Sequence, residues 1–135
     1  MKTITVFTPA YNRAHTLRRA FNSLKAQTCK DFEWLIIDDG STDGTSELVE
    51  RLQEEADFPI RYYWKENGGR HTAVNYSYQF LQTKYVVTLD SDDELTPNAV
   101  ELMRRTWNSI PKERYDHIWC VSGREMDANT LQLVG

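Results

Sequence analysis

The chain has 135 residues, enough for one domain with its own core and too few for two ordinary domains. It is 40% hydrophobic and 27% charged with a formal net charge of −4, which excludes a disordered chain and gives no sign of nucleic-acid binding. No apolar stretch approaches the roughly 20 residues of a membrane span, and the start is too short for a signal peptide. Cys29 and Cys120 match no metal-binding spacing and favour a reducing cytoplasm.

The first half of the chain alternates strand and helix patterns. Residues 3–8 predict a strand that Pro9 ends. Asn12 is predicted to cap the next helix, whose apolar positions recur at helical spacing: Leu17, Ala20, Phe21 and Leu24. A second strand over residues 32–37 leads into an acidic, glycine-containing loop. Asp43 in that loop is predicted to cap a helix over about residues 45–55.

The second half repeats the pattern. A third strand is predicted over residues 59–64, followed by a Gly68-Gly69 loop that opens a helix. The apolar, β-branched run from residue 85 to 89 predicts a central strand. Thr96 and Pro97 then predict the start of a fourth helix, with Val100, Met103 and Trp107 on its apolar stripe. Residues 117–122 predict a fifth strand. Trp34, Trp64 and Trp107 all stand at core-type positions.

Strands that alternate with helices predict an α/β fold with a mostly parallel sheet, flanked by helices on both faces in a Rossmann-like layout. The order of the strands within the sheet does not follow from the sequence. In this layout the carboxyl ends of the strands share one edge, where ligands bind. Four polar loops are predicted to meet there as a pocket: residues 8–11, 38–39, 68–70 and 90–93.

The loop after the fourth strand carries three acids within four residues. Like charges this close repel one another unless a cation lies between them, and carboxylate oxygens at alternate positions suit Mg²⁺ or Mn²⁺. Asp90 and Asp92 are therefore predicted metal ligands. The competing interpretation is an acidic corner in which aspartates cap a helix.

The other loops carry groups suited to a nucleotide. Asp39 can accept hydrogen bonds from the N–H edge of a base, or it can cap a turn, and the spacing does not choose between the two. Asp38 is more typical of a turn residue. Tyr11 offers an aromatic face to a ring or packs within its loop. Arg70, beside two glycines at a helix start, can meet a base carbonyl or a phosphate, and neighbouring His71 can touch a phosphate or lie beside the helix cap.

These segments carry a family resemblance. Residues 8–13, 36–45, 67–75 and 89–93 resemble the successive motifs of family 2 glycosyltransferases, in the family's order. The resemblance covers roughly residues 3–100. It implies a GT-A fold, a UDP- or GDP-linked sugar donor, Mn²⁺ or Mg²⁺, and inverting transfer to a carbohydrate or lipid-linked acceptor, as in polysaccharide biosynthesis.

The resemblance also implies roles for individual residues. The nucleotide-binding positions are Thr8, Ala10, Tyr11, Arg13, Asp39, Arg70 and Asp90. Asp92 would bind the metal directly, and Asp90 would lie at the ribose or at a metal-bound water. Asp93 matches the family pattern less closely.

Family members continue into an acceptor-binding half that supplies a general base. Residues 1–135 are therefore expected to form a nucleotide-sugar-binding domain without the acceptor half, and no catalytic base is identified. Glu125 and Asp127 are interpreted as solvated loop acids. A binding fragment without catalytic activity is the alternative function. A phosphotransfer domain is disfavoured because no lysine follows the acids in a suitable place before Lys112. We expect a cytoplasmic location, or a peripheral one at the membrane face for a longer protein.

Overall fold

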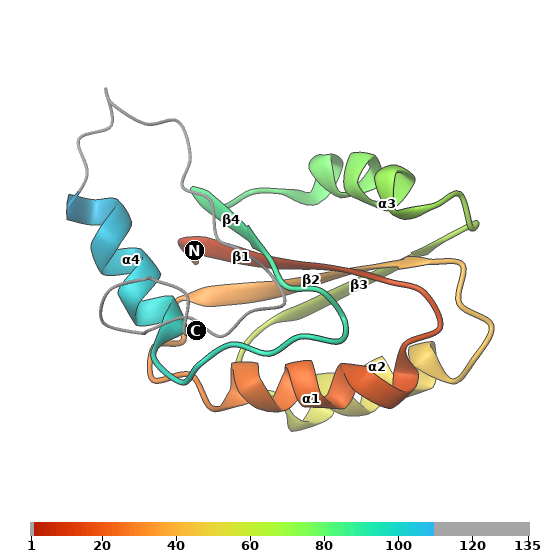
Figure 1. Cartoon of the computed structure of the whole chain (residues 1–135), viewed down its shortest axis with the longest axis horizontal. Helices are drawn as coiled ribbons and strands as arrows, with labels where there is room; N and C mark the ends of the chain where they lie inside the picture. Colours follow the sequence, from red (N-terminus) through yellow and green to blue (C-terminus); the bar gives the residue numbers. More distant parts are fainter. Residues whose placement is uncertain (1, 110–135) are drawn as a thin grey trace, which may run out of the picture.

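A four-stranded parallel sheet forms the centre of the computed structural model, which describes residues 2–109 (Figure 1). Its strands are β1 (Ile4–Ala10), β2 (Phe32–Asp39), β3 (Ile60–Lys65) and β4 (Tyr85–Thr88). The helices are α1 (Ala14–Lys25), α2 (Thr45–Glu55), α3 (Arg70–Ser77), the short 3₁₀ helix η1 (Tyr78–Phe80) and α4 (Ala99–Ser109). The predicted fifth strand, together with Cys120, Glu125 and Asp127, lies outside the described residues.

The strand order is β3-β2-β1-β4, and every pairing is parallel. Ala10 pairs with Asp38 and Asp39 pairs with Lys65, so β1, β2 and β3 end at nearly the same level. In the described part of the chain β4 lies at one edge of the sheet, where the sequence predicted a central strand. Val86 accordingly remains 41% exposed.

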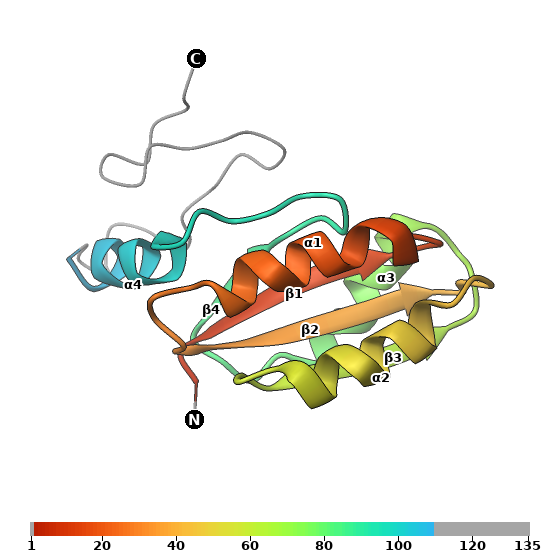
Figure 2. The ribbon, with the colours of Figure 1, turned by 90° about the horizontal axis from the view of Figure 1, so that it is seen from below.

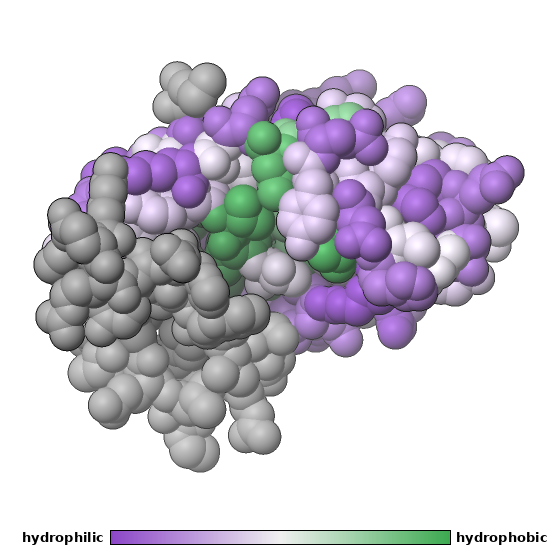
Figure 3. Space-filling model, turned by 90° about the horizontal axis from the view of Figure 1, so that it is seen from above, coloured by the Kyte–Doolittle hydropathy of each residue, from purple (hydrophilic) through white to green (hydrophobic). Residues whose placement is uncertain are grey.

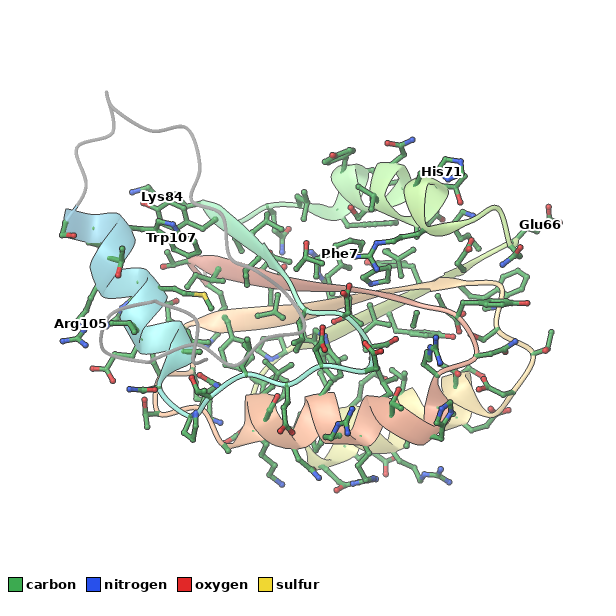
Figure 4. The ribbon with its side chains drawn as sticks, in the orientation of Figure 1. Phe7, Glu66, His71, Lys84, Arg105 and Trp107 are labelled. Atoms are coloured by element: carbon green, nitrogen blue, oxygen red, sulfur yellow. The ribbon has the colours of Figure 1, made fainter. Side chains whose placement is uncertain are left out.

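Helices cover both faces of the sheet, which confirms the predicted Rossmann-like layering. Helices α1 and α2 lie side by side on one face, and α3 lies on the other (Figures 1 and 2). The larger core packs α1, α2 and α4 against the sheet around Trp34 and Phe21. A smaller core under α3 contains Phe7, which Figure 4 shows between β1 and α3. Most of the described surface on the α3 side is hydrophilic, apart from one hydrophobic strip near its middle (Figure 3).

The first strand continues through Pro9 to Ala10, beyond its predicted end. The carbonyl of Phe7 accepts a hydrogen bond from Leu89, on the β4 side of the strand. Backbone groups two residues apart along a strand point to the same side. The backbone nitrogen of Pro9, which carries no hydrogen, therefore also faces β4. The β4 ladder ends at Thr88, opposite Phe7, so proline removes no ladder hydrogen bond there.

Two other local predictions were wrong. Asn12 does not cap α1, because its side chain turns toward the loop after β2. Trp64 is 52% exposed rather than part of the core, since it lies near the end of β3, an outer strand of the described sheet. Among the described residues no helix combines the length and apolar character needed to cross a bilayer.

Candidate functional site at the carboxyl edge of the sheet

A hollow of about 380 Å³ opens at the carboxyl edge of the sheet, lined by the last residue of β2 and by residues at or after the ends of the other three strands. Most of the residues predicted to bind a nucleotide or metal lie on its walls. The lining consists of Pro9, Ala10, Tyr11, Arg13, Asp39, Asn67, Gly69, Arg70, Ala73, Asp90, Ser91 and Asp92. The parallel topology thus brings together residues as far apart in the sequence as Pro9 and Asp92.

The acidic wall of the hollow comes from the turn after β4. The Asp93 amide donates to the Asp90 carbonyl at 3.0 Å, which closes this turn. The Asp90 carboxylate lies against Arg70, whereas the exposed Asp92 carboxylate makes no hydrogen bond or ion pair with the residues that the structure describes. No cluster of three metal-binding side chains occurs within residues 2–109. The chain therefore offers two carboxylates, a donor set that fits Mg²⁺ or Mn²⁺ when phosphate oxygens and waters complete the coordination.

The cationic wall comes from the start of α3. The Arg70 guanidinium lies 2.6 Å from Oδ1 of Asp90, yet the Arg70 side chain remains 60% exposed. A glycine with a φ of +100°, Gly69, precedes it and directs the chain into the helix. A charged fork at a helix start, partly open to solvent, suits a ligand that carries phosphate.

Asp39 is buried at the floor of the hollow, where its carboxylate accepts four hydrogen bonds. Oδ1 accepts from the Lys65 ammonium at 2.9 Å and from the Gly68 amide at 2.9 Å. Oδ2 accepts from the Gly69 amide at 2.8 Å and from the Asn67 side chain at 3.2 Å. Burial raises the pKa of this carboxyl, but the hydrogen bonds from Lys65, Gly68 and Gly69 outweigh burial, and the net shift is downward.

These bonds occupy all the lone-pair directions that a carboxylate offers. The direct base contact predicted for Asp39 would require one of them to break or to be shared. What the carboxylate does in this structure is fix the loop between β3 and α3, and with it the position of Arg70.

Asp38 has the turn role that its position predicted. Its Oδ1 accepts from the Ser41 amide at 2.8 Å, and its Oδ2 accepts from the Tyr62 hydroxyl. Burial and this bond to Asp38 both raise the pKa of Tyr62. Asp38 does not line the hollow.

Of the four predicted residues at the end of β1 and in the β1–α1 loop, three line the hollow and one does not. Ala10, Arg13 and the half-exposed Tyr11 line it. Thr8 is fully buried behind them, where its hydroxyl accepts from the Trp34 indole at 2.8 Å and donates to the Leu89 carbonyl at 2.5 Å. Its side chain thus joins β1 and β2 to the residue that follows β4, and it does not line the hollow.

A cluster that sequence reasoning missed ties the β1–α1 loop to the β2–α2 loop. Asn12, with a φ of +50°, accepts from the Thr42 amide at 2.9 Å and donates its own amide to the Ser41 hydroxyl at 2.8 Å. Asp43, predicted to cap α2, stands one residue before the N-cap Gly44. Its carboxylate still accepts from the Thr45 amide at the start of α2, at 3.1 Å, and from the Ala14 amide at the start of α1, at 3.2 Å. This cluster fixes Tyr11 and Arg13 at the hollow.

The Asp43 carboxylate thus serves the first turns of two helices. Burial raises its pKa, but the hydrogen bonds from Thr45 and Ala14 outweigh burial and lower it overall. The one sequence signal available for this cluster was Asn12 itself, because asparagine tolerates a positive φ better than most residues.

The two histidines among the described residues lie outside the hollow. His15 is exposed on α1, as predicted, and His71 lies exposed on the outer side of α3 (Figure 4). Neither belongs to the lining.

Comparison with known proteins places this geometry in a family. The family model described as glycosyl transferase family 2 matches residues 5–129. The chain is 40% identical over 99 residues to a chondroitin synthase of Pasteurella multocida, covering 73% of this chain and 10% of that protein. It is 38% identical over 98 residues to an uncharacterized glycosyltransferase of a Nostoc species, covering 73% of this chain and 30% of that protein.

Solved structures agree. A mannosyltransferase from Pyrobaculum calidifontis, in complex with GDP-Man and Mn²⁺, is 25% identical with a TM-score of 0.73, covering 81% of this chain and 33% of that one. TarS of S. aureus in complex with UDP is 27% identical with a TM-score of 0.70, covering 80% of this chain and 32% of that one. These likenesses confirm the predicted GT-A fold. The chain spans between one tenth and two fifths of the length of the curated relatives named in these matches. By its sequence and its fold, this chain belongs to glycosyltransferase family 2.

Proposed function

We propose that the hollow binds the nucleoside diphosphate of an activated sugar together with Mg²⁺ or Mn²⁺. The whole protein would then transfer the sugar, with inversion, to a hydroxyl of a carbohydrate or lipid-linked acceptor. The observation that carries the proposal is the meeting of an acid pair, a partly exposed arginine and an exposed tyrosine in one hollow of a family 2 chain. Fold neighbours hold GDP-Man with Mn²⁺ and UDP in complexes of this kind.

The acid pair would hold the metal. Asp92 offers an exposed carboxylate, and Asp90 offers a second one two residues earlier. A divalent cation bound there would act as a Lewis acid that stabilises the negative charge on the departing diphosphate.

The remaining residues would bind and orient the donor. Arg70 can exchange its contact with Asp90 for a phosphate oxygen, because its side chain is already largely exposed. Tyr11 presents an aromatic face beside the hollow, suited to stacking on a base. Asp39 would act mainly through the loop that carries Arg70, since that loop uses its lone pairs.

Calorimetric titration of the chain with UDP, GDP and ADP, each with and without Mn²⁺, tests the proposal. We expect one of the uridine or guanosine diphosphates to bind in a strongly Mn²⁺-dependent manner. The Asp92→Ala variant should lose the metal-dependent part of the affinity and keep its melting temperature, because the Asp92 side chain is exposed and makes no hydrogen bond or ion pair with the described residues. Equal weak binding of all three nucleotides, unaffected by Mn²⁺, would overturn the proposal.

A second measurement distinguishes an active transferase from the alternative, a fragment that binds the nucleotide without turnover. Release of free sugar from the nucleotide sugar chosen by the titration, or its transfer to an added acceptor, would show catalytic activity. Tight binding without either reaction would assign the chain a binding role.

A further inference from the structure

The segment after Asp90 has no regular structure before α4, yet its course is fixed along a helix. It leaves the carboxyl edge of the sheet and runs back beside α1 until α4 begins (Figures 1 and 2). Its backbone bonds to a row of polar side chains on α1 and just past its end, here called the α1 rail: Thr16, Arg19, Ser23 and Gln27. Spacings of three and four residues place Thr16, Arg19 and Ser23 in one line along the helix, and Gln27 follows two residues after the helix ends.

The first two residues of the α1 rail hold the acidic turn itself. The Thr16 hydroxyl donates to the carbonyl of Ser91 at 3.0 Å. The Arg19 guanidinium donates to the carbonyl of Asp92. Together they hold the two consecutive peptide groups that carry the acid turn.

The last two residues hold the segment farther along. Ser23 accepts from the Leu95 amide at 3.1 Å. Gln27 donates to the Thr96 carbonyl at 2.7 Å and accepts from the Val100 amide at 3.0 Å, so it caps the start of α4. Ser23 and Gln27 are buried, and buried polar groups require hydrogen-bond partners such as these. Gln27 also explains why α4 begins at Ala99 and not at the Thr96–Pro97 pair predicted from the sequence.

We propose that Thr16 and Arg19 are positioning residues for the metal site, holding the Asp90–Asp92 turn so that both carboxylates face the hollow. The inference rests on the proposed function, because it assigns those carboxylates to a metal. Ligands of a metal must be held within about 0.5 Å of their productive positions, and a segment without secondary structure does not achieve this alone. In this chain the backbone of the turn is fixed from α1, which leaves the Asp92 side chain available.

Neighbouring arginines on α1 provide a matched pair of variants. Arg19 contacts the acidic turn, whereas Arg18 pairs with Glu55 on α2 at 2.9 Å. Arg19→Gln and Arg18→Gln remove the same charge from adjacent, solvent-accessible positions. Thr16→Val removes the hydroxyl at nearly constant side-chain size, whereas Thr16→Ser keeps the hydroxyl.

The readout is the affinity for UDP with Mn²⁺ divided by the affinity without Mn²⁺. If another nucleoside diphosphate binds better than UDP, that diphosphate is used instead. We expect Arg19→Gln and Thr16→Val to lower this ratio by about tenfold, as loss of a partner of a metal ligand commonly does. Arg18→Gln and Thr16→Ser should retain it. Equal ratios in Arg18→Gln and Arg19→Gln, or an unchanged ratio in Thr16→Val, would overturn the positioning role while leaving the proposed function intact.

Hydrogen exchange on the unliganded chain provides a readout independent of nucleotide. Amide exchange in a peptide covering residues 90–96 should be faster in Arg19→Gln than in Arg18→Gln, because the turn loses its tie to α1. If the wild-type chain shows no Mn²⁺-dependent binding, the proposed function fails, and the metal-positioning inference fails with it. Unchanged exchange in Arg19→Gln would show that Arg19 does not hold the turn.

Discussion

The guanidinium of Arg70 pairs with the carboxylate of Asp90 at 2.6 Å across the mouth of the hollow. A cation from α3 thus occupies one of the two acids that a divalent metal would use. Because the Arg70 side chain is 60% exposed, this pair adds less than about 1 kcal/mol to the free energy of unfolding. The pair matters for ligand binding, since a metal would compete for Asp90 and a diphosphate would compete for Arg70.

Replacing Arg70 with methionine should separate the two ligands. We expect Mn²⁺ alone to bind a few-fold more tightly, because Asp90 and Asp92 then repel each other without a neighbouring cation. We expect the nucleoside diphosphate to bind about tenfold more weakly, since it loses a charge-assisted hydrogen bond. Titration of each ligand separately checks both directions, and weaker Mn²⁺ binding in the variant would contradict the competition.

Removing the Asp39 carboxylate should destabilise the fold. In Asp39→Ala the Lys65 ammonium, 17% exposed, loses its carboxylate partner, and two loop amides lose their acceptor. We expect a loss of about 3 kcal/mol or more in the free energy of unfolding, typical of breaking a buried ion pair. Urea denaturation measures it.

The double variant Asp39→Ala/Lys65→Met is the control. It should recover part of the stability, because no unpaired charge remains buried. If Asp39→Ala weakened nucleotide binding and left stability unchanged, Asp39 would instead be the base contact that its sequence position predicted.

The low pKa values of Asp39 and Asp43 predict a stability that depends on pH. Both carboxyls have a pKa in the folded chain below the value of about 3.9 expected when unfolded. The unfolded chain therefore binds more protons in acid, so this stabilisation is present above about pH 4 and is lost as the pH falls through the folded values. Urea denaturation between pH 6 and pH 2 should show the decline. Asp43→Asn should give a shallower decline of stability with falling pH. Parallel curves for the variant and the wild type would contradict the contribution assigned to the Asp43 carboxyl.

Asn12 should be sensitive to both its backbone and its side chain. Asn12→Gly keeps the positive φ accessible and loses the ties to Thr42 and Asp43, whereas Asn12→Ala loses the ties and strains the backbone. We expect Ala to be less stable than Gly by about 1 kcal/mol. Thermal denaturation of the two variants gives the comparison, and equal melting temperatures would mean that the φ of +50° carries no cost.

The strands and helices were largely predictable, because each depends on a local pattern. The β-branched runs of β1, β2 and β4 and the apolar stripes of α1 and α4 follow from side-chain periodicity. Helix α3 was less clear. It ends at Ser77 and continues as one 3₁₀ turn, so that Phe80 can stack on Tyr63 from the neighbouring strand. That contact joins segments 17 residues apart, and no local pattern contains it.

The site was predictable as a set of loops but not as a set of contacts. Parallel topology ensures that the loops after the strands share one edge, which is why Tyr11, Asp39 and Asp90 were found. The α1 rail was missed because Thr16 and Arg19 belong to a helix whose polar face appears solvated in sequence. The family resemblance assigned Thr8 to the nucleotide, and a motif does not reveal that the Thr8 hydroxyl is already bonded on two sides.

The relay from the Trp34 indole through the Thr8 hydroxyl to the Leu89 carbonyl joins the centre of the sheet to the peptide that precedes Asp90. An indole N–H proton gives a distinct signal in nuclear magnetic resonance spectra. Because Trp34 is fully buried, we expect its signal to be sheltered from solvent and to shift when the acid turn moves. The Trp34 indole would therefore serve as a spectroscopic reporter on the metal binding proposed for the acid turn, located in the core and requiring no label at the site.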